Sequence, residues 1–403
     1  MKLRRWWKSH GSKVLKIAIV ILAGFAILKL GSEFWRLVMG ETWLGAIDLK
    51  IRHHEVTRWF AGKPIYHIPS AVYPPASYVF FWPLLGWLSI PLARWFCLVT
   101  TLATLGWLCS LIVRESGAEN RLERVFVVLM LLSMNPLGVS IGNGQITLYV
   151  LTLLTAGLML IARDRHSLSR DLLAAFLIMV SLTKPNVSVP FFWLVLIVPG
   201  RLRPAIFVGV GYLASTFLGT TFQGDGLFAL LQDWLDRTEV CGSVGDSTDV
   251  ISMINVSGAT MAWQRGNITS GLILVGLGIW ISAHRKVDFW ILLGVTAVIA
   301  RIWTYHKLYD NVLILLPMVA LFQAAKGVSS SERGSFLAGI LLALNVMAML
   351  IPSSCYNFWL HPWPTVFIYT CFFVWTLDLI YLLSIAWRAR WRGGRARVGS
   401  DPA

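Results

Sequence analysis

Apolar runs of about 18 residues or more recur along the whole chain, and each is long enough to cross a bilayer core of roughly 30 Å. Only 14% of the 403 residues are charged, whereas 56% are hydrophobic, which is far from the balance of a soluble domain. Many of the 20 Trp and 10 Tyr residues lie near the ends of these runs, as in interfacial aromatic belts. The sequence therefore predicts an all-α polytopic membrane protein.

Charged and turn residues divide the apolar sequence into about twelve predicted membrane spans. Residues 76–90 are short and contain Pro83 and Gly86, so we expect them to lie at the outer interface as a juxtamembrane helix. One broken span over 171–198 is the alternative to two short ones, because Lys184-Pro185-Asn186 interrupts it. The predicted spans are 14–39, 92–113, 124–140, 145–162, 171–183, 186–198, 204–222, 269–284, 287–302, 308–325, 335–351 and 364–387.

The basic residues predict the orientation of these spans. The net charge is +15, and Lys and Arg gather at both termini, including a basic tail over 388–403, and in alternate short loops. The positive-inside rule explains this distribution better than binding of nucleic acid does. Both termini are therefore expected in the cytoplasm, with the protein in the plasma membrane.

The chain reads as one integral-membrane domain over 1–403, with a first external loop at 40–91 and a second at 223–268. The second loop contains an amphipathic helix, expected at 227–235, and a Gly/Ser/Asp-rich stretch. Neither an internal repeat nor a phosphate-binding motif of the Walker type is present, which disfavours ATP-driven transport by this chain. Of five cysteines, Cys241 and Cys355 fall in external loops, and whether they form a disulfide stays open.

Ionisable residues are concentrated in the first external loop. Asp48 follows the first span and begins a segment expected to be helical over 49–60. At the membrane surface, partial desolvation would give its carboxylate a pKa suited to a general base, although a solvated loop carboxylate is the alternative. Further polar side chains are candidates for substrate binding, with the polar face of an interfacial helix as the alternative for the first three: His53, His54, Glu55, Tyr66, Tyr73 and Gln145.

Basic side chains also interrupt two later apolar segments. Lys184 lies at a membrane boundary, where a cation is costly enough to suggest a function, although a snorkelling lysine is the alternative. Around the turn at 303–308, Arg301, His306 and Lys307 could bind a phosphate at the lipid headgroup level. His306 and Asp310 are spaced i, i+4 and would pair if this turn were helical. No charge pair at the bilayer midplane, which would mark a transporter, is evident from the sequence.

Six short motifs follow one another in an order that resembles glycosyltransferase family 87 of the GT-C superfamily, the polyprenyl-phosphate-mannose-dependent mannosyltransferases. The resemblance covers most of residues 40–320, and Leu49 departs from it, since the family often has an aromatic or acidic residue after the first Asp. The motifs are Asp48, Ala61-Gly62-Lys63-Pro64-Ile65-Tyr66, Tyr73-Pro74-Pro75, Gly144-Gln145, Lys184-Pro185, and Tyr305-His306-Lys307-Leu308-Tyr309 with Pro317.

This resemblance implies an inverting transfer of a hexose from a polyprenyl phosphate to a lipid or glycan acceptor on the outer face, with Asp48 as the base. The sugar is mannose by resemblance, with arabinofuranose or another hexose left open. Lys184, Arg301, His306 and Lys307 would bind the donor phosphate. No metal is required, although the acidic second loop leaves a divalent ion as a less favoured alternative. A transporter or flippase, or an assembly subunit, is the competing class.

Overall fold

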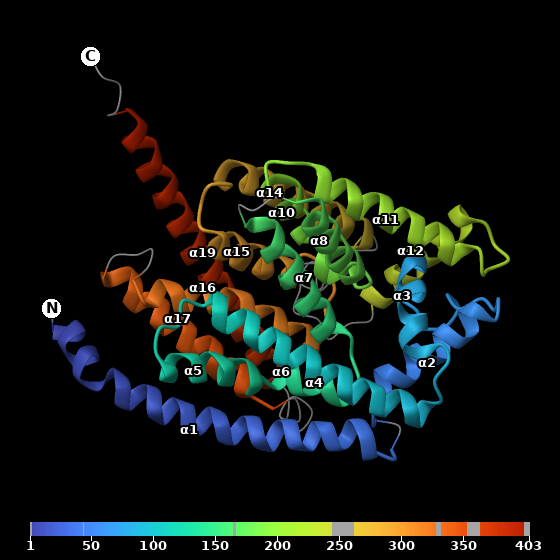
Figure 1. The fold of residues 1–403 in the computed structure, drawn as a ribbon, viewed down its shortest axis with the longest axis horizontal. Coiled ribbons are helices and arrows are strands. Elements are labelled where there is room, and N and C mark those ends of the chain that lie inside the picture. The colour runs from blue at the N-terminus through green and yellow to red at the C-terminus, as the bar shows by residue number, and fades with distance from the viewer. Residues whose placement is uncertain are drawn as a thin grey trace.

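The computed structural model describes residues 2–42, 44–163, 167–243, 262–327, 332–352 and 363–398. Every regular element in these ranges is a helix, which confirms the predicted all-α class. The helices pack side by side, and the first and the last described residues both lie on the left in Figure 1. The short helices that follow the first span lie at the other end.

The elements alternate long helices with short helical segments. They are α1 (Lys2–Met39), α2 (Ile47–Phe60), α3 (Pro75–Leu85), α4 (Ile90–Glu115), α5 (Arg121–Leu132), α6 (Asn135–Asn143), α7 (Thr147–Ala162), α8 (Leu168–Ser181), α9 (Pro185–Ser188), η1 (Val189–Phe191), α10 (Phe192–Ile197), α11 (Arg203–Thr220), α12 (Leu227–Ser243), α14 (Ala262–His284), α15 (Phe289–Ile302), η2 (Leu308–Ile314), α16 (Leu315–Ala325), α17 (Glu332–Leu350) and α19 (Trp363–Val398).

A helical segment lies within each of the twelve predicted spans, but the described helices differ in length. Five are long and apolar enough to cross a membrane, or six if α5 and α6, which meet at a bend of 52°, form one span. Four shorter apolar helical segments accompany them. The long ones are Gly11–Met39, Ile90–Glu115, Leu308–Ala325, Arg333–Leu350 and Val366–Trp391.

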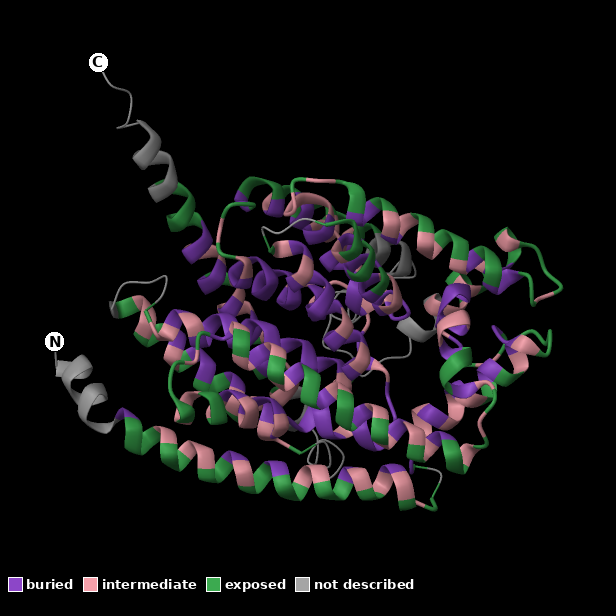
Figure 2. Cartoon of the chain, in the orientation of Figure 1, coloured by how far each residue is buried: buried purple, intermediate pink, exposed green. Residues whose placement is uncertain are grey.

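The core and the periphery follow from how apolar residues are distributed around each helix. In α1, 11% of the most apolar stretch is buried, against 78% in the segment formed by η2 and α16. Figure 2 shows the same contrast, with exposed residues along α1 and buried residues through α15 and α16. A helix that is apolar on all sides belongs inside a bundle, whereas α1 presents residues such as Ile17 and Leu28 outward, as a lipid-facing helix would.

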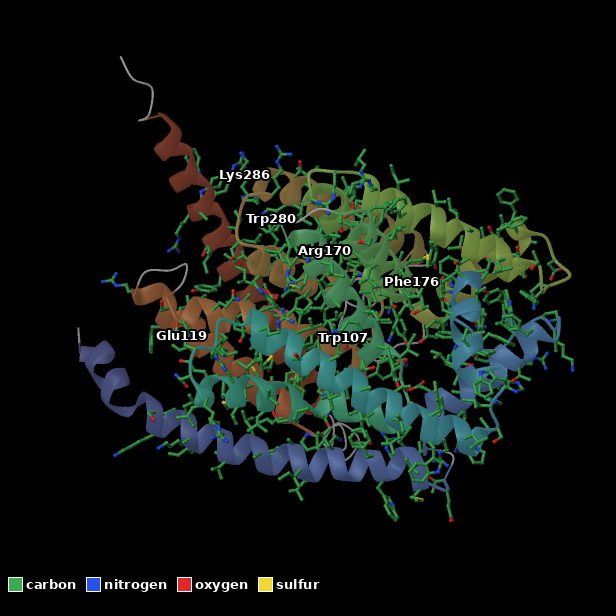
Figure 3. The ribbon with its side chains drawn as sticks, in the orientation of Figure 1. Trp107, Glu119, Arg170, Phe176, Trp280 and Lys286 are labelled. Carbon is green, nitrogen blue, oxygen red and sulfur yellow. The ribbon has the colours of Figure 1, made fainter. Side chains whose placement is uncertain are left out.

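Predicted cytoplasmic loops meet at one end of the bundle. Arg163, just after α7, pairs with Glu115 at the end of α4 at 3.0 Å. Lys326, after α16, pairs with Glu123 at 2.8 Å. Glu119, from the same loop as Glu115, and Lys286, from a further such loop, lie toward this end in Figure 3, away from α2 and α3. Thr147, at the start of α7, lies at the opposite end of this helix from Arg163. The length of α7 therefore separates the polar residues around Thr147 from those around Arg163.

The chain turns back on itself between α8 and α10. Asp171 in the first turn of α8 pairs with Arg201, which follows α10, at 2.6 Å. The start of one helical segment and the end of the next therefore lie at the same level, with Lys184 at the turn between them. This hairpin favours two short passes over a single broken span for 171–198.

Three short helices lie outside the long bundle, where the sequence places them. The expected segments 49–60, 76–90 and 227–235 correspond to α2, α3 and the longer α12. Where the predicted spans 124–140 and 145–162 meet, the chain forms helix α6, which has Pro136 in its first turn and is followed by Gly144 in the left-handed conformation. The side chain of Cys241 and the whole of Cys355 fall outside the described residues, and with them the disulfide considered above.

Cysteine labelling in intact cells tests the orientation. A Cys at Ser167, exposed before α8, should be shielded from an impermeant thiol reagent if that loop is cytoplasmic. A Cys at Lys63, exposed in the first external loop, should react. Both are introduced into a variant without the native cysteines, and permeabilised cells give the control for reactivity. Labelling of Ser167→Cys from outside would overturn the alternation of the spans around it.

Candidate active site

The start of α2 is held against the end of α6 by a backbone hydrogen bond and by two residues with positive φ. Ala46, which precedes α2, has a positive φ of 53° and donates its N–H to the Gly142 carbonyl at 3.1 Å. Gly144 also has a positive φ, and a Cβ there would come within 2.7 Å of the Leu49 Cβ. Strained backbone of this kind persists where the surroundings enforce it, often at functional sites. Asp48 is held between these two contacts.

Asp48 has a carboxylate oxygen that no described group satisfies. It lies in the first turn of α2, where the helix dipole favours a negative charge. Its Oδ2 is buried and has no hydrogen-bond partner among the described residues. Burial raises the pKa of Asp48, while the charges of Arg52 and Lys184 and a hydrogen bond with Asn143 oppose that rise. A buried carboxylate with a free acceptor and a raised pKa is suited to taking a proton.

Both carboxylate oxygens of Glu55, by contrast, are bonded to neighbouring side chains. It forms a buried ion pair with Arg52 and accepts a hydrogen bond from the Ser70 hydroxyl at 2.8 Å. The Tyr78 hydroxyl is 3.5 Å away, and Arg52 also donates to the Ser70 carbonyl at 2.8 Å. A buried ion pair whose two members both make further hydrogen bonds rigidifies a site, and its carboxylate has no free oxygen for a reaction. Glu55 therefore supports the wall of the site.

Two tyrosines of the first external loop join this wall to the bundle. The Tyr73 hydroxyl donates to Gln145 Oε1 at 3.3 Å, and the Arg52 guanidinium lies 4.6 Å from the centre of the Tyr73 ring. The Tyr66 hydroxyl donates to the Tyr73 carbonyl at 3.0 Å. Tyr66, Tyr73 and Gln145, three of the expected substrate-binding residues, thus form one connected layer beside Arg52.

Lys184 lies in a buried polar triad that links three distant segments. Its ammonium donates to Asp310 in a short ion pair and to Thr147 Oγ1 at 2.7 Å. The Thr147 hydroxyl is itself 2.9 Å from Asp310 Oδ1, and the Tyr309 ring centre lies 4.6 Å from the Lys184 ammonium. Lys184 and Asp310 therefore form a buried charge pair, which the sequence did not reveal. The charges of Lys184 and Asp310 both act on Asp48, so the triad and Asp48 belong to one site.

The partner of Asp310 differs from the one expected. The turn before η2 is not helical, so His306 and Asp310 do not stack one turn apart. Asp310 instead pairs with Lys184 and accepts the Lys307 backbone N–H at 3.2 Å, which caps η2. Lys307 itself is exposed, with its ammonium 5.2 Å from the centre of the Tyr305 ring.

His306 is buried beside this triad with one ring nitrogen unpartnered among the described residues. Its Nδ1 bonds to the Thr304 carbonyl at 2.8 Å and therefore carries the proton, which leaves the lone pair on the buried Nε2. Burial lowers the pKa of His306 to about 4, so the ring is neutral near pH 7. Arg301 lies close by, with its Nε bonded to Asn311 at 2.5 Å and its guanidinium 5.1 Å from the Trp375 ring centre.

His53 and His54 do not join this site. His53 Nε2 is 2.7 Å from the Leu88 carbonyl, and His54 is exposed. At 100° per residue, Asp48, Arg52 and Glu55 share one face of α2, whereas His53 and His54 lie roughly 120–140° away from Asp48. Helical geometry therefore separates them from the carboxylate, although they are close to it in sequence.

The site combines a carboxylate and buried cations without a metal cluster. Among the described residues, no group of three His, Cys, Asp or Glu side chains is placed to hold a metal ion. Arg52, Thr147 and Asp310 were not expected in the site. A charge at Asp310 within an apolar segment was a visible signal, but its partner is 126 positions away in sequence and appears only in the fold.

The fold and this polar layer define a helical membrane protein with the carboxylate of Asp48 beside buried cations at one end of its bundle. The model of glycosyltransferase family 87 matches residues 71–324, more than half of the chain, and the protein therefore belongs to that family of membrane glycosyltransferases. The match includes Tyr73, Gln145, Lys184 and His306 but begins after Asp48. No curated protein matches the chain.

Proposed function

We propose that this glycosyltransferase transfers a hexose from a polyprenyl phosphate to a hydroxyl of a lipid or glycan acceptor at the outer face of the plasma membrane. The family resemblance favours mannose over arabinofuranose or another hexose. The proposal includes twelve spans of the GT-C type in one domain, with both termini in the cytoplasm. The donor would reach the site sideways from the lipid.

The observation that carries this proposal is the Oδ2 of Asp48, which is buried, has no partner among the residues that the structure describes, and belongs to the same site as Lys184. In the proposed reaction, Asp48 takes the proton of the acceptor hydroxyl as its oxygen attacks the anomeric carbon. The bond from that carbon to the phosphate oxygen breaks, and the configuration inverts. Tyr73 and Gln145 would bind sugar hydroxyls beside Arg52, whereas Glu55 would hold the wall.

The leaving phosphate gains charge as this bond breaks, so cations near it lower the barrier. Lys184 is the central candidate, because its ammonium is buried and held in place by Asp310 and Thr147. Arg301 and His306 lie in the same polar layer, and the exposed Lys307 flanks it. Because neutral His306 offers a lone pair at Nε2, it would bind a phosphate oxygen by taking up a proton.

His306→Ala should weaken donor use by about 1.5–3 kcal/mol, the scale of a hydrogen bond to a charged group. Donor affinity of the native protein should rise as the pH falls, because the imidazole gains its proton when phosphate binds. His284→Ala is a matched control, since His284 is also buried, bonds a carbonyl through Nδ1 at 2.9 Å and has an unpartnered Nε2 in the described structure. Titration of polyprenyl phosphate against both variants is the measurement. Equal affinities would remove His306 from the site.

Incubation of the purified protein with radiolabelled polyprenyl-phosphate mannose and membrane lipid extract tests the function as a whole. We expect label to move to a new lipid or glycan product. Parallel reactions with other polyprenyl-phosphate sugars decide the sugar. Movement of intact donor across vesicle membranes without a product would instead indicate the flippase.

A further inference from the structure

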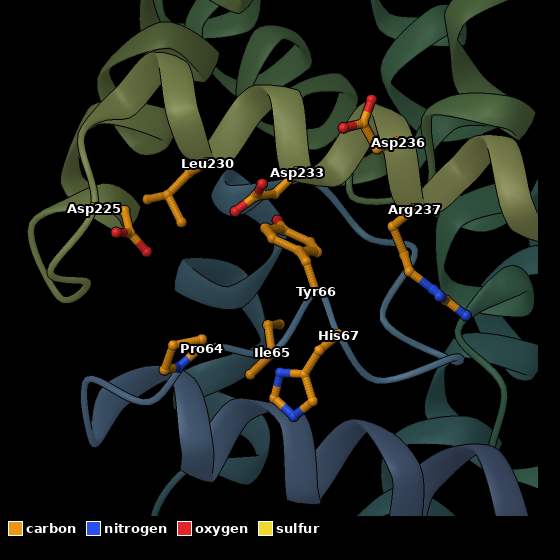
Figure 4. Close-up of a pocket in the computed structure, with 9 residues that line it drawn as sticks. All are labelled: Pro64, Ile65, Tyr66, His67, Asp225, Leu230, Asp233, Asp236 and Arg237. Atoms are coloured by element: carbon orange, nitrogen blue, oxygen red, sulfur yellow. The ribbon is translucent and has the colours of Figure 1, made fainter.

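A cavity of about 400 Å³ lies between the first and second external loops. One wall is the turn from Pro64 to His67, and the other is α12 with the residue Asp225 before it (Figure 4). The two walls are more than 150 residues apart in sequence. A cavity of this volume is large enough for a small ligand or one or two sugar rings.

The two walls differ in chemistry. Ile65 and the ring of Tyr66 give an apolar, rigid surface, since Tyr66 is buried and packs edge-on against Trp59 with ring centres 5.9 Å apart. Asp233 and Asp236 line the cavity from α12, and Figure 4 shows Asp233 next to the Tyr66 ring. An apolar face opposite carboxylate acceptors suits a sugar ring, whose C–H faces are apolar and whose hydroxyls donate hydrogen bonds.

Other ligand classes fit this cavity less well. Its three carboxylates outnumber the one guanidinium, that of Arg237, which disfavours an anion. The described carboxylates do not converge closely enough, with His67, to form a metal site. A neutral polyhydroxylated ligand is neither an anion nor a metal ion, and it therefore fits this cavity better.

Hydrogen bonds connect the walls of the cavity to the proposed active site. The Tyr66 hydroxyl donates to the Tyr73 carbonyl at 3.0 Å, and Tyr73 in turn bonds Gln145. On the other wall, Trp234 Nε1 of α12 donates to the Val72 carbonyl at 3.0 Å. Both walls are therefore anchored to the segment that carries Tyr73, so a molecule in the cavity would lie beside the layer formed by Tyr66, Tyr73 and Gln145.

We propose that this cavity binds the neutral glycan part of the acceptor, with Asp233 and Asp236 accepting its hydroxyl hydrogen bonds. That the glycan belongs to the acceptor rests on the proposed function. Binding of a glycan in the cavity, by contrast, can be measured without any transfer. It predicts that the enzyme extends an acceptor that already carries sugar.

Saturation-transfer NMR on the detergent-purified full chain tests this proposal with the methyl glycosides of mannose, glucose, galactose and arabinofuranose as probes. We expect at least one of them to bind the native protein. Asp233→Ala/Asp236→Ala should weaken that binding at least about tenfold, the scale of losing a hydrogen bond to a charged group. Both side chains are exposed, so the variant should melt like the native protein. Glu41→Ala, at an exposed carboxylate elsewhere in the first external loop, is the control.

Binding should persist in Asp48→Asn, which separates this inference from the catalytic role of that residue. Failure of every glycoside to bind the native protein would overturn the inference, as would unchanged affinity in the double variant. A signal that requires added Ca²⁺ would also overturn it, since the carboxylates would then hold a metal. If the glycosides bind as expected but no sugar is transferred, the proposed function fails and the binding site stands.

Discussion

Asp48→Asn should lower the rate of sugar transfer by about 10²–10⁴-fold, the usual contribution of a general base. Asn has nearly the same shape and can keep the contact with Asn143, but it cannot take the acceptor proton. Donor binding and thermal stability should therefore stay close to native. Transfer per folded molecule, donor titration and melting of the purified variant are the measurements, with Glu41→Gln in the same loop as the control.

The pH dependence of transfer gives Asp48 a second signature. Burial raises the pKa of this carboxyl above its ordinary value of 3.8, and the base works only when ionised. Transfer should therefore decline on acidification through that raised pKa. The residual activity of Asp48→Asn should lack this decline. Glu55→Gln should act differently, since it breaks the buried pair with Arg52 and lowers the melting temperature. Normal transfer by folded Asp48→Asn would assign the base elsewhere.

Lys184→Ala should destabilise the protein by about 3–5 kcal/mol, because it leaves the Asp310 carboxylate buried without its cation. Thr147 alone cannot compensate that charge. Thermal unfolding of the purified protein measures the loss. Arg163→Ala is the matched control, since it breaks an ion pair with Glu115 whose arginine is largely exposed, which should cost at most about 1 kcal/mol.

A second variant separates the structural role of Lys184 from its role toward the donor. Lys184→Met/Asp310→Leu removes both charges, and apolar replacement of a whole buried pair is often neutral for stability. We expect it to recover stability but to remain defective in donor use, because the phosphate has lost its cation. Recovery of normal donor affinity together with stability would show that the pair serves only the fold.

The sequence predicted the helical elements well, because each depends on a local pattern. Apolar runs indicated the helical segments, although only five of the described helices are long and apolar enough to cross a membrane, or six with the bent pair. The amphipathic segments after them indicated α2 and α12. The hairpin of α8 and α10 was left open, since it depends on the pairing of Asp171 with Arg201. The positive φ of Ala46 could not be predicted from the sequence, because alanine rarely adopts a positive φ.

The site was less predictable, because its contacts join residues that are far apart in the chain. Lys184 was singled out by the cost of its charge, but Asp310 was assigned to His306, its neighbour in sequence. His53 and His54 were included because they are near Asp48 in the chain, and helical rotation turns them away. Glu55 was expected to bind substrate, and only the fold shows that Arg52 and Ser70 bond its carboxylate.

The central claim is that Asp48 drives transfer of a sugar from a lipid phosphate to an acceptor hydroxyl. Single-turnover transfer from radiolabelled polyprenyl-phosphate mannose tests it most directly, with native protein and Asp48→Asn compared at equal amounts of monodisperse enzyme. The account predicts that native protein moves label to a product of inverted anomeric configuration, while label in the variant stays on the donor. Transfer by the variant at the native rate, or retention of configuration by the native protein, would contradict it.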